Sequence, residues 1–340
     1  MNDRILMKHG AGGRAMRMLI EETFVRGAPG ELPEGSVGLD AMDDGAAIRM
    51  GDRWLVMTAD SHVISPAFFP GGDIGRLAVA GTVNDLAMMG ATEVVGLTCA
   101  VILEEGYPRE ELERIVASIR AASREARAPV VTGDTKVMGK GEIDGIVIST
   151  AGVAFTSRVV RDSGLKVGDR IVVTGTLGDH GMAVMAVRHN LGLEGELLSD
   201  VAPLGQLVAL LLSKHGDAVT AMKDPTRGGL ASALHEMASK GGVGVVLDEP
   251  SLPVRDEVRS AADLLGIDPL YVANEGKAVV GVRPEAAEAV VATLREHPLG
   301  RRAAIVGTCV AERPGALVLD TGFGRRLVAE LDGEPLPRIC

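Results

Sequence analysis

Short apolar runs in the first half of the chain predict strands, and one helically spaced segment predicts a helix. The strands are predicted at residues 54–58, 94–103, 130–132 and 143–155, the last as a central strand. Residues 108–126 predict a helix, because apolar residues recur every three or four positions after Pro108, which suits a first helical turn. Strands 54–58 and 130–132 are each followed by an aspartate, Asp60 and Asp134.

The second half alternates strand-like and helix-like segments. Strands are predicted at 170–174, 243–247, 278–282, 303–308 and 316–320. Helices are predicted at 181–190, 203–214, 228–240, 254–265 and 284–297. This alternation predicts an α/β or α+β domain rather than a helical bundle.

The length predicts two domains, since 340 residues is about twice the size of a typical domain. We place the first domain at residues 1–155 and the second at 165–330. Residues 331–340 contain two prolines and one glycine, a composition that favours neither helix nor strand. We therefore expect an extended, mobile tail.

Composition restricts the classes of protein that the chain can belong to. Hydrophobic residues make up 46% and charged residues 24%, which excludes wholesale disorder. The formal charge of −11 argues against a protein that binds nucleic-acid backbone, although carboxylates can still hold the Mg²⁺ of a nucleotide. No apolar window is long enough for a membrane span, and the N-terminus has no apolar leader. We expect a cytoplasmic protein without a membrane partner.

Three cysteines fit a reducing compartment and provide no disulfide framework. Cys99 and Cys309 lie in apolar runs and are predicted to be buried. Cys340 is the last residue, where a thiol on an extended tail can reach more than one site. On the residues alone, a terminal cysteine is more often incidental than functional.

Several aspartates lie beside glycines or near strand ends, where they are candidates for holding Mg²⁺ and phosphate. Mg²⁺ prefers oxygen ligands, and one or two carboxylates for each ion are sufficient when phosphate oxygens complete the shell. Aspartate beside glycine is also typical of turns and helix caps. Asp85 stands apart, because the pair Asn84-Asp85 lies within a helix of small residues without an evident structural reason. The candidates are Asp44, Asp60, Asp85, Asp134 and Asp224.

Two glycine-rich loops carry a nearby basic residue, at positions 8–14 and 227–229. Glycines allow backbone N–H groups to approach phosphate oxygens, although most such loops are simple turns. The common signatures GxxxxGK[ST], HExxH, GxSxG and CxxC are absent. His180 and His235 lack metal-ligand spacing and are interpreted as structural or substrate-lining residues.

Together, these motifs resemble the HypE family of hydrogenase maturation factors. The resemblance extends from His9-Gly10 to Cys340, and its most specific element is the terminal Pro-Arg-Ile-Cys. The segments that carry it are 68–75, 81–87, 131–137, 224–231, 271–277 and 337–340.

The resemblance implies the two-domain fold of the aminoimidazole-ribonucleotide-synthetase (PurM-like) superfamily. An N-terminal α+β domain would pair across a homodimer to form a β-barrel, and a C-terminal α/β domain would complete a site for ATP and Mg²⁺. The implied nucleotide-binding residues are Gly10, Gly12, Gly13, Asp44, Asp60, Asp85, Asp134, Thr135 and Asp224. Among them, Asp44, Asp85 and Asp224 are the implied metal ligands.

The resemblance also implies a reaction on the tail. A carbamoyltransferase, HypF, would carbamoylate Cys340, and ATP-dependent dehydration would convert the S-carboxamide to a thiocyanate. Its cyanide would then pass to the iron held by a HypC–HypD complex. Lys136 and Glu275 are the implied proton-handling pair, with a surface lysine and a helix-capping glutamate as the alternative.

Two other classes of function remain possible on the sequence. Selenophosphate synthetase, thiamine-monophosphate kinase and aminoimidazole-ribonucleotide synthetase share the superfamily. The first would need a cysteine in the N-terminal glycine loop, which has none, and the others have no use for a terminal cysteine. A non-catalytic carrier that uses Cys340 for thiol attachment is the alternative from a different class.

Overall fold

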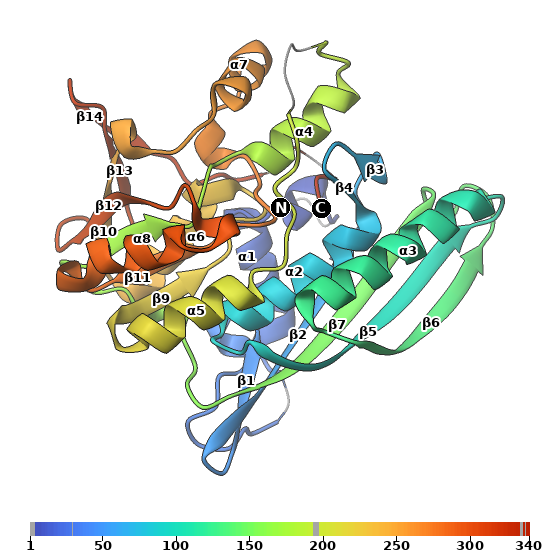
Figure 1. The fold of residues 1–340 in the computed structure, drawn as a ribbon, viewed down its shortest axis with the longest axis horizontal. Helices are drawn as coiled ribbons and strands as arrows, with labels where there is room; N and C mark the ends of the chain where they lie inside the picture. Colours follow the sequence, from blue (N-terminus) through green and yellow to red (C-terminus); the bar gives the residue numbers. More distant parts are fainter. Residues whose placement is uncertain (1–3, 29, 193–196, 334–335, 337) are drawn as a thin grey trace.

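Two β-sheets and the helices packed on them form the molecule (Figure 1). The computed structural model describes residues 4–28, 30–192, 197–333, 336 and 338–340. The first sheet has the strand order β1-β2-β7-β5-β6. Its strands are β1 (Ala46–Met50), β2 (Arg53–His62), β5 (Glu93–Glu104), β6 (Val130–Met138) and β7 (Ile146–Thr156). The central position predicted for the segment around 143–155 is therefore confirmed, because β7 lies between β2 and β5.

Two helices pack on this sheet. Helix α3 (Arg109–Ala126) begins after Pro108, as predicted, and lies beside α2 (Ile74–Met88) (Figure 1). Asp73 caps α2 by accepting hydrogen bonds from the backbone N–H groups of Gly75 and Arg76. Nearly all residues of α2 are small or apolar and are buried. The helix can therefore lie between the sheet, α3 and the second half of the chain. A short hairpin, β3 (Phe68–Phe69) with β4 (Gly72–Asp73), precedes it.

The second sheet has seven strands in the order β14-β13-β10-β12-β8-β11-β9. Strands β10 and β13 are parallel, and the other pairs are antiparallel. The strands are β8 (Arg170–Val173), β9 (Val219–Lys223), β10 (Gly244–Asp248), β11 (Val279–Val282), β12 (Ala304–Val310), β13 (Leu317–Asp320) and β14 (Arg325–Val328). The helices of this half are α4 (Asp179–Arg188), α5 (Gly205–His215), α6 (Gly229–Gly241), α7 (Asp256–Leu265) and α8 (Ala287–Arg295).

Asn84 joins the two halves, which accounts for this polar residue inside a buried helix. Its Nδ2 donates to the carbonyl oxygens of Ala202 and Glu275 at 3.1 and 3.2 Å, and its Oδ1 accepts the N–H of Leu204 at 2.7 Å. A buried amide with all of these partners orients the segments that it bonds. Asn84 therefore holds α2 against the loops that carry part of the candidate site.

Several sequence-based expectations need correction. Strand β2 continues to His62 and β6 to Met138, so Asp60 and Asp134 lie within strands rather than after them. Cross-strand pairing extends both strands beyond their apolar stretches. Cys309 is buried as predicted, whereas Cys99 is only half-buried. Strands β1, β9 and β14, and helix α1 (Arg14–Ile20), were not predicted.

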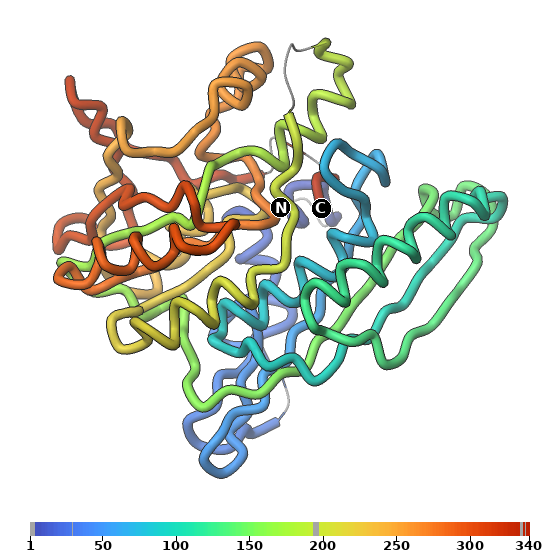
Figure 2. The backbone as a smooth tube through the Cα atoms, in the orientation of Figure 1, coloured from blue at the N-terminus to red at the C-terminus, as the bar shows by residue number. Residues whose placement is uncertain are grey.

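The described part of the tail is docked on the protein. Backbone N–H groups of Val63 and Ser65 donate to the backbone oxygens of Cys340 and Arg338 at 3.2 and 3.3 Å, so the tail lies alongside the chain that leaves β2. The side chains of Leu336 and Ile339 are buried in the core. Figure 2 shows that the C-terminal end lies near the middle of the molecule in this view. Pro337, part of the family-like terminal motif, lies outside the described residues.

No helix among the described residues is long and apolar enough to cross a membrane.

Candidate active site

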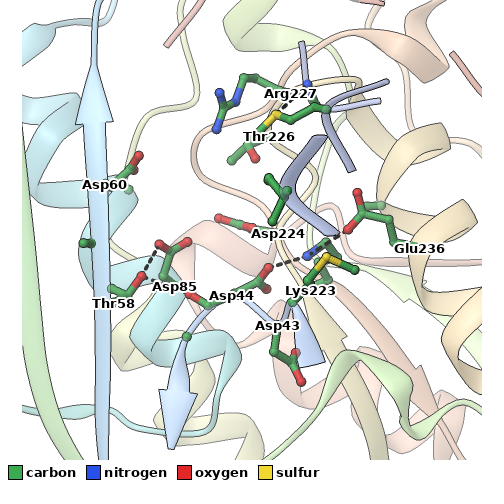
Figure 3. A pocket seen from close by; sticks show the side chains of 18 of the residues that line it. Asp43, Asp44, Thr58, Asp60, Asp85, Lys223, Asp224, Thr226, Arg227 and Glu236 are labelled. Carbon is green, nitrogen blue, oxygen red and sulfur yellow. Dashed lines mark hydrogen bonds and ion pairs between the residues drawn. The ribbon is translucent and has the colours of Figure 1, made fainter. Parts of the chain in front are cut away.

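A cavity of about 560 Å³ is lined by residues from the N-terminal loop, from both halves of the chain and from the tail. Most of the sequence-predicted site residues line it, although they are far apart in the chain. These are Gly12, Gly13, Asp44, Asp60, Asp85, Asp224, Glu275 and Cys340. Figure 3 shows the carboxylates of Asp44, Asp85 and Asp224 facing a common space, with Asp60 on the neighbouring strand.

The carboxylates come from four different elements. Asp44 precedes β1, Asp60 lies in β2, Asp85 lies in α2, and Asp224 follows β9. The Thr58 hydroxyl donates to Asp85 Oδ2 at 2.8 Å, which orients that carboxylate toward the cavity. The four elements are spread over both halves of the sequence, and only the packing of the two halves brings the four carboxylates into one cavity.

Burial and mutual repulsion raise the pKa values of this cluster. Burial, followed by the charge of Asp44, raises the pKa of Asp224 to about 8. Burial and the charge of Asp224 likewise raise the pKa of Asp85 well above its usual value. The pKa of Asp44 is also raised, mainly by burial, although Lys223 opposes that effect. A divalent cation would relieve this repulsion, which makes the cluster electrostatically suitable for one.

Lys223 neutralises one side of the cluster. Its ammonium group contacts Asp44 directly and lies 3.4 Å from Glu236 and 3.7 Å from Asp162. Burial alone would lower the pKa of Lys223, but the three carboxylates outweigh this effect and raise it well above its usual value. Lys223 therefore stays charged and ties the loop before β1 to the end of β9.

Some buried oxygen atoms of the cavity remain available to a ligand, among them those of two acidic side chains. Asp44 Oδ2 and Glu275 Oε1 accept no hydrogen bond from any described residue. Buried polar atoms are normally satisfied, so unsatisfied ones in a cavity are typical of a site that awaits a partner. However, the described residues contain no cluster of three His, Cys, Asp or Glu side chains ready to hold a metal ion. The carboxylates share one cavity without forming a preassembled metal centre.

Glu275 is the most strongly enclosed acid of the cavity. Burial, and then the charges of Asp224 and Asp60, raise its pKa well above the usual value. Its backbone N–H donates to Asp200 Oδ1 at 3.0 Å, and its backbone oxygen accepts from Asn84. A glutamate with a raised pKa and a fixed backbone is suited to proton transfer.

The N-terminal glycine loop packs against two other segments. A Cβ atom on Gly12, whose φ is +77°, would lie 2.6 Å from Arg227 Cβ, and one on Gly13 would lie 2.3 Å from the backbone oxygen of Leu331. The loop thus contacts the second glycine-rich loop and the start of the tail. Gly10 does not line the cavity, but its carbonyl accepts a hydrogen bond from Arg227 at 3.2 Å.

Three predicted site residues lie elsewhere in the described chain. Asp134, Thr135 and Lys136 are exposed on β6, which is an edge strand of the first sheet. Lys136 Nζ forms an ion pair with Asp134 Oδ2 at 2.6 Å, and neither residue lines the cavity. The expected pairing of Lys136 with Glu275 is therefore not formed within one chain, because β6 is separated from the cavity by β5 and β7.

Sequence reasoning missed His62 and Lys223. His62 lines the cavity, and its Nε2 lies 3.4 Å from Asp60 Oδ2, while burial lowers the pKa of its imidazole. The two-residue spacing of Asp60 and His62 in a strand puts both on one face, a signal that was available in the sequence. Lys223 adjoins Asp224, but nothing local indicates that it meets Asp44.

Comparison with known proteins identifies first a class and then a family. Residues 42–156 match the N-terminal domain and residues 166–320 match the C-terminal domain of AIR synthase related proteins. The two-sheet fold is thus that of a protein class with a PurM-like fold, and one HypE member of this class has been solved in complex with ATP.

The chain is 48% identical to the carbamoyl dehydratase HypE of Azotobacter vinelandii, over its full length and 98% of that protein. It matches HypE in a crystal structure of a HypE–HypF complex with a TM-score of 0.84 and 41% identity, covering 92% of this chain and 99% of that one. It also matches HypE in complex with ATP with a TM-score of 0.81 and 40% identity, covering 99% and 100%. The chain belongs to the HypE family of carbamoyl dehydratases.

Proposed function

We propose that this protein is an ATP-dependent carbamoyl dehydratase that acts on a carbamoyl group carried by its own Cys340. The observation that carries the proposal is the position of Cys340, which lines the same cavity as Glu275 and the carboxylates. A terminal cysteine that was incidental would not need a docked tail that ends in an acidic cavity. HypE relatives named as carbamoyl dehydratases support the same reaction.

The chemistry requires the loss of one oxygen and two N–H protons from the S-carboxamide, leaving S–C≡N. Bound ATP would supply the phosphoryl group that makes the amide oxygen a leaving group. Glu275, once ionised, would accept an N–H proton, and its burial, its position in the cavity lining and its unsatisfied Oε1 support this role. The buried docking of Leu336 and Ile339 keeps the tail in place while this happens.

Mg²⁺ would be held by Asp44, Asp85 and Asp224. Their raised pKa values and the unsatisfied Asp44 Oδ2 fit a cation, and phosphate oxygens and water would complete its coordination. The loop with Gly12 and Gly13 would provide backbone N–H groups to the phosphates.

A homodimer would bring the β6 residues to a second cavity. Strand β6 is an exposed edge, and Val131 and Val137 on it are 65% and 66% exposed. Long exposed apolar edges favour pairing with another chain. We propose that two first-half sheets pair to form a β-barrel, through which Asp134, Thr135 and Lys136 would contribute to the ATP site of the partner subunit. The boundaries proposed for the two domains remain 1–155 and 165–330.

The same function implies two protein partners. HypF is present with HypE in a solved complex, so a HypF-type carbamoyltransferase is the expected source of the carbamoyl group. A HypC–HypD complex is the expected acceptor of cyanide. Both steps require Cys340 to leave the cavity, since the docked thiol is surrounded by the protein's own residues.

Intact-mass spectrometry tests the function directly. The protein incubated with its carbamoyltransferase should gain the mass of one carbamoyl group and then lose the mass of one water on addition of Mg²⁺ and ATP. The variant Cys340→Ala should show neither change, whereas Cys309→Ala, which alters a buried cysteine that does not line the cavity, should show both. The same mass changes in Cys340→Ala would refute the proposal.

A further inference from the structure

A buried histidine of α4 holds the backbone of the tail next to Cys340. His180 is completely buried, and its Nε2 lies 2.7 Å from the carbonyl oxygen of Ile339. Its Nδ1 lies 2.8 Å from Ser199 Oγ, and its ring meets Phe69 edge-on with 5.2 Å between the ring centroids. Both nitrogens of the ring therefore have a partner, and the ring itself is packed in place.

The partners determine which nitrogen carries the proton. The Ile339 carbonyl can only accept, so Nε2–H donates to it, and Nδ1 accepts the hydroxyl proton of Ser199. Burial lowers the pKa of His180, although Asp200 and the contact with Ile339 oppose this effect. A neutral imidazole with one donor and one acceptor matches the two partners.

The hydrogen bond from His180 is made to the residue immediately before the terminal cysteine. Ile339 directly precedes Cys340, so a bond to its carbonyl restricts the orientation of the final residue. Arg188, also in α4, donates to the carbonyl of Arg338, and Val63 N–H donates to Cys340 O. The tail is thus held by the segment that follows β2 on one side and by α4 on the other.

The loop that orients His180 also supports Glu275. Asp200, next to Ser199, accepts the backbone N–H of Glu275 at 3.0 Å and forms an ion pair with Lys277 at 2.9 Å. Ser199 N–H donates to the carbonyl of Pro70 at 2.8 Å, which anchors this loop to the first half of the chain. One loop therefore fixes the histidine that binds the tail and the acid that lines the same cavity as the tail's thiol.

We propose that His180, oriented by Ser199, is a positioning residue that binds the Ile339 carbonyl and thereby places the Cys340 thiol in the cavity. Its effect on turnover rests on the proposed function, whereas its effect on tail docking does not. Loss of the bond should increase the undocked fraction of the tail about fivefold, the factor that corresponds to one buried hydrogen bond of about 1 kcal/mol.

The test measures the alkylation rate of Cys340 by a bulky maleimide, followed in the C-terminal peptide by mass spectrometry, without carbamoylation or ATP. His180→Phe keeps a ring but removes both hydrogen bonds, and should react about fivefold faster than the unmodified chain. His180→Gln restores an N–H donor near Nε2 and should react at nearly the original rate. His235→Phe, which alters a buried histidine bonded to Gly315 and Val328, is the matched control and should leave the rate unchanged.

Ser199→Ala provides a second variant in case His180→Phe does not fold. It removes the hydroxyl that orients the ring and should raise the alkylation rate in the same direction. Circular dichroism establishes that each variant is folded. Rates within twofold of the original for every folded variant would overturn the proposal, as would an equal increase in His235→Phe.

Turnover provides a separate readout. In the carbamoylated protein, kcat for thiocyanate formation follows the docked fraction of the tail, so His180→Phe should lower kcat by less than about fivefold. The KM for ATP should stay unchanged, because the variant displaces the tail and not the nucleotide. A rise in the KM for ATP with unchanged kcat would contradict a positioning role. If the protein has no dehydratase activity at all, the proposed function fails, yet the alkylation rates still decide whether His180 positions the tail.

Discussion

Asp224→Asn should raise the free energy of unfolding in the absence of Mg²⁺ and ATP. In their presence the variant should be less stable than the original protein. Asp224 is 6% exposed and lies among other carboxylates in the cavity. Its pKa is raised from 3.8 to about 8, so the folded state holds this proton to a higher pH than the unfolded state does. Ionising Asp224 therefore opposes folding, and asparagine removes that cost while keeping the shape of the side chain.

The magnitude follows from the pKa. Each unit of difference corresponds to about 1.4 kcal/mol, so the rise from 3.8 to about 8 gives a penalty of roughly 6 kcal/mol at pH 8 and above. The penalty is absent below about pH 4 and grows between pH 4 and 8. Because Asp44 and Asp85 share the proton and charge of this cluster, we expect one amide to recover about 2 kcal/mol.

Denaturant unfolding at several pH values measures this effect. Fluorescence of Trp54, the single tryptophan, reports on the first sheet, and circular dichroism reports on the whole chain. The difference between Asp224→Asn and the original protein should be near zero at pH 4 and reach its maximum near pH 8. With Mg²⁺ and ATP the order should reverse, since only the original protein keeps three carboxylates for the cation.

Asp134→Asn is the matched control. Hydrogen bonds from Lys136 and from the backbone N–H of Thr135 lower the pKa of this exposed carboxylate, so its removal should bring no gain in stability at pH 8. A difference for Asp224→Asn that is independent of pH, or a loss of stability at pH 8 without ligands, would refute the electrostatic reasoning.

Three further perturbations test other parts of the site. Lys223→Met should lower the free energy of unfolding by about 3–5 kcal/mol in urea titrations, since it leaves buried carboxylates unpaired, and an unchanged midpoint would contradict this role. Gly81→Ala should weaken ATP binding about tenfold by calorimetry, because the new Cβ would lie 2.8 Å from Asp60 Oδ2, whereas equal affinity would show that Asp60 can move freely. Val131→Asp should convert the proposed dimer to monomers in light-scattering measurements, and a dimer that persists would exclude β6 as the interface.

Much of the secondary structure was accessible from the sequence because local patterns determine it. The helix at 109–126 shows its apolar spacing and its proline start, and β7 shows a long, mainly apolar segment. Strands β9 and β14 were missed because their sequences, Val-Thr-Ala-Met-Lys and Arg-Arg-Leu-Val, contain no continuous apolar run, and their stability comes from neighbours in the sheet. The ends of β2 and β6 were placed too early for the same reason.

The residues predicted for the candidate site fall into two groups, those that line the cavity and those that do not. Asp44, Asp85 and Asp224 were selected by residue type and by their surroundings, and the structure brings them into one cavity. Asp134 and Lys136 were selected on the same grounds, but the sheet places them on an exposed edge. No local pattern separates these two groups, because the distance to the cavity depends on strand order.

The sequence by itself determined the acids, the glycine loops and the terminal thiol, since residue type and spacing set what chemistry is available. Only the tertiary structure decided that Cys340 is docked, that Lys223 binds Asp44, and that His180 contacts the tail. The physical reason is that each of these contacts joins residues more than 100 positions apart. Such pairs are set by how the two sheets pack, which no short stretch of sequence encodes.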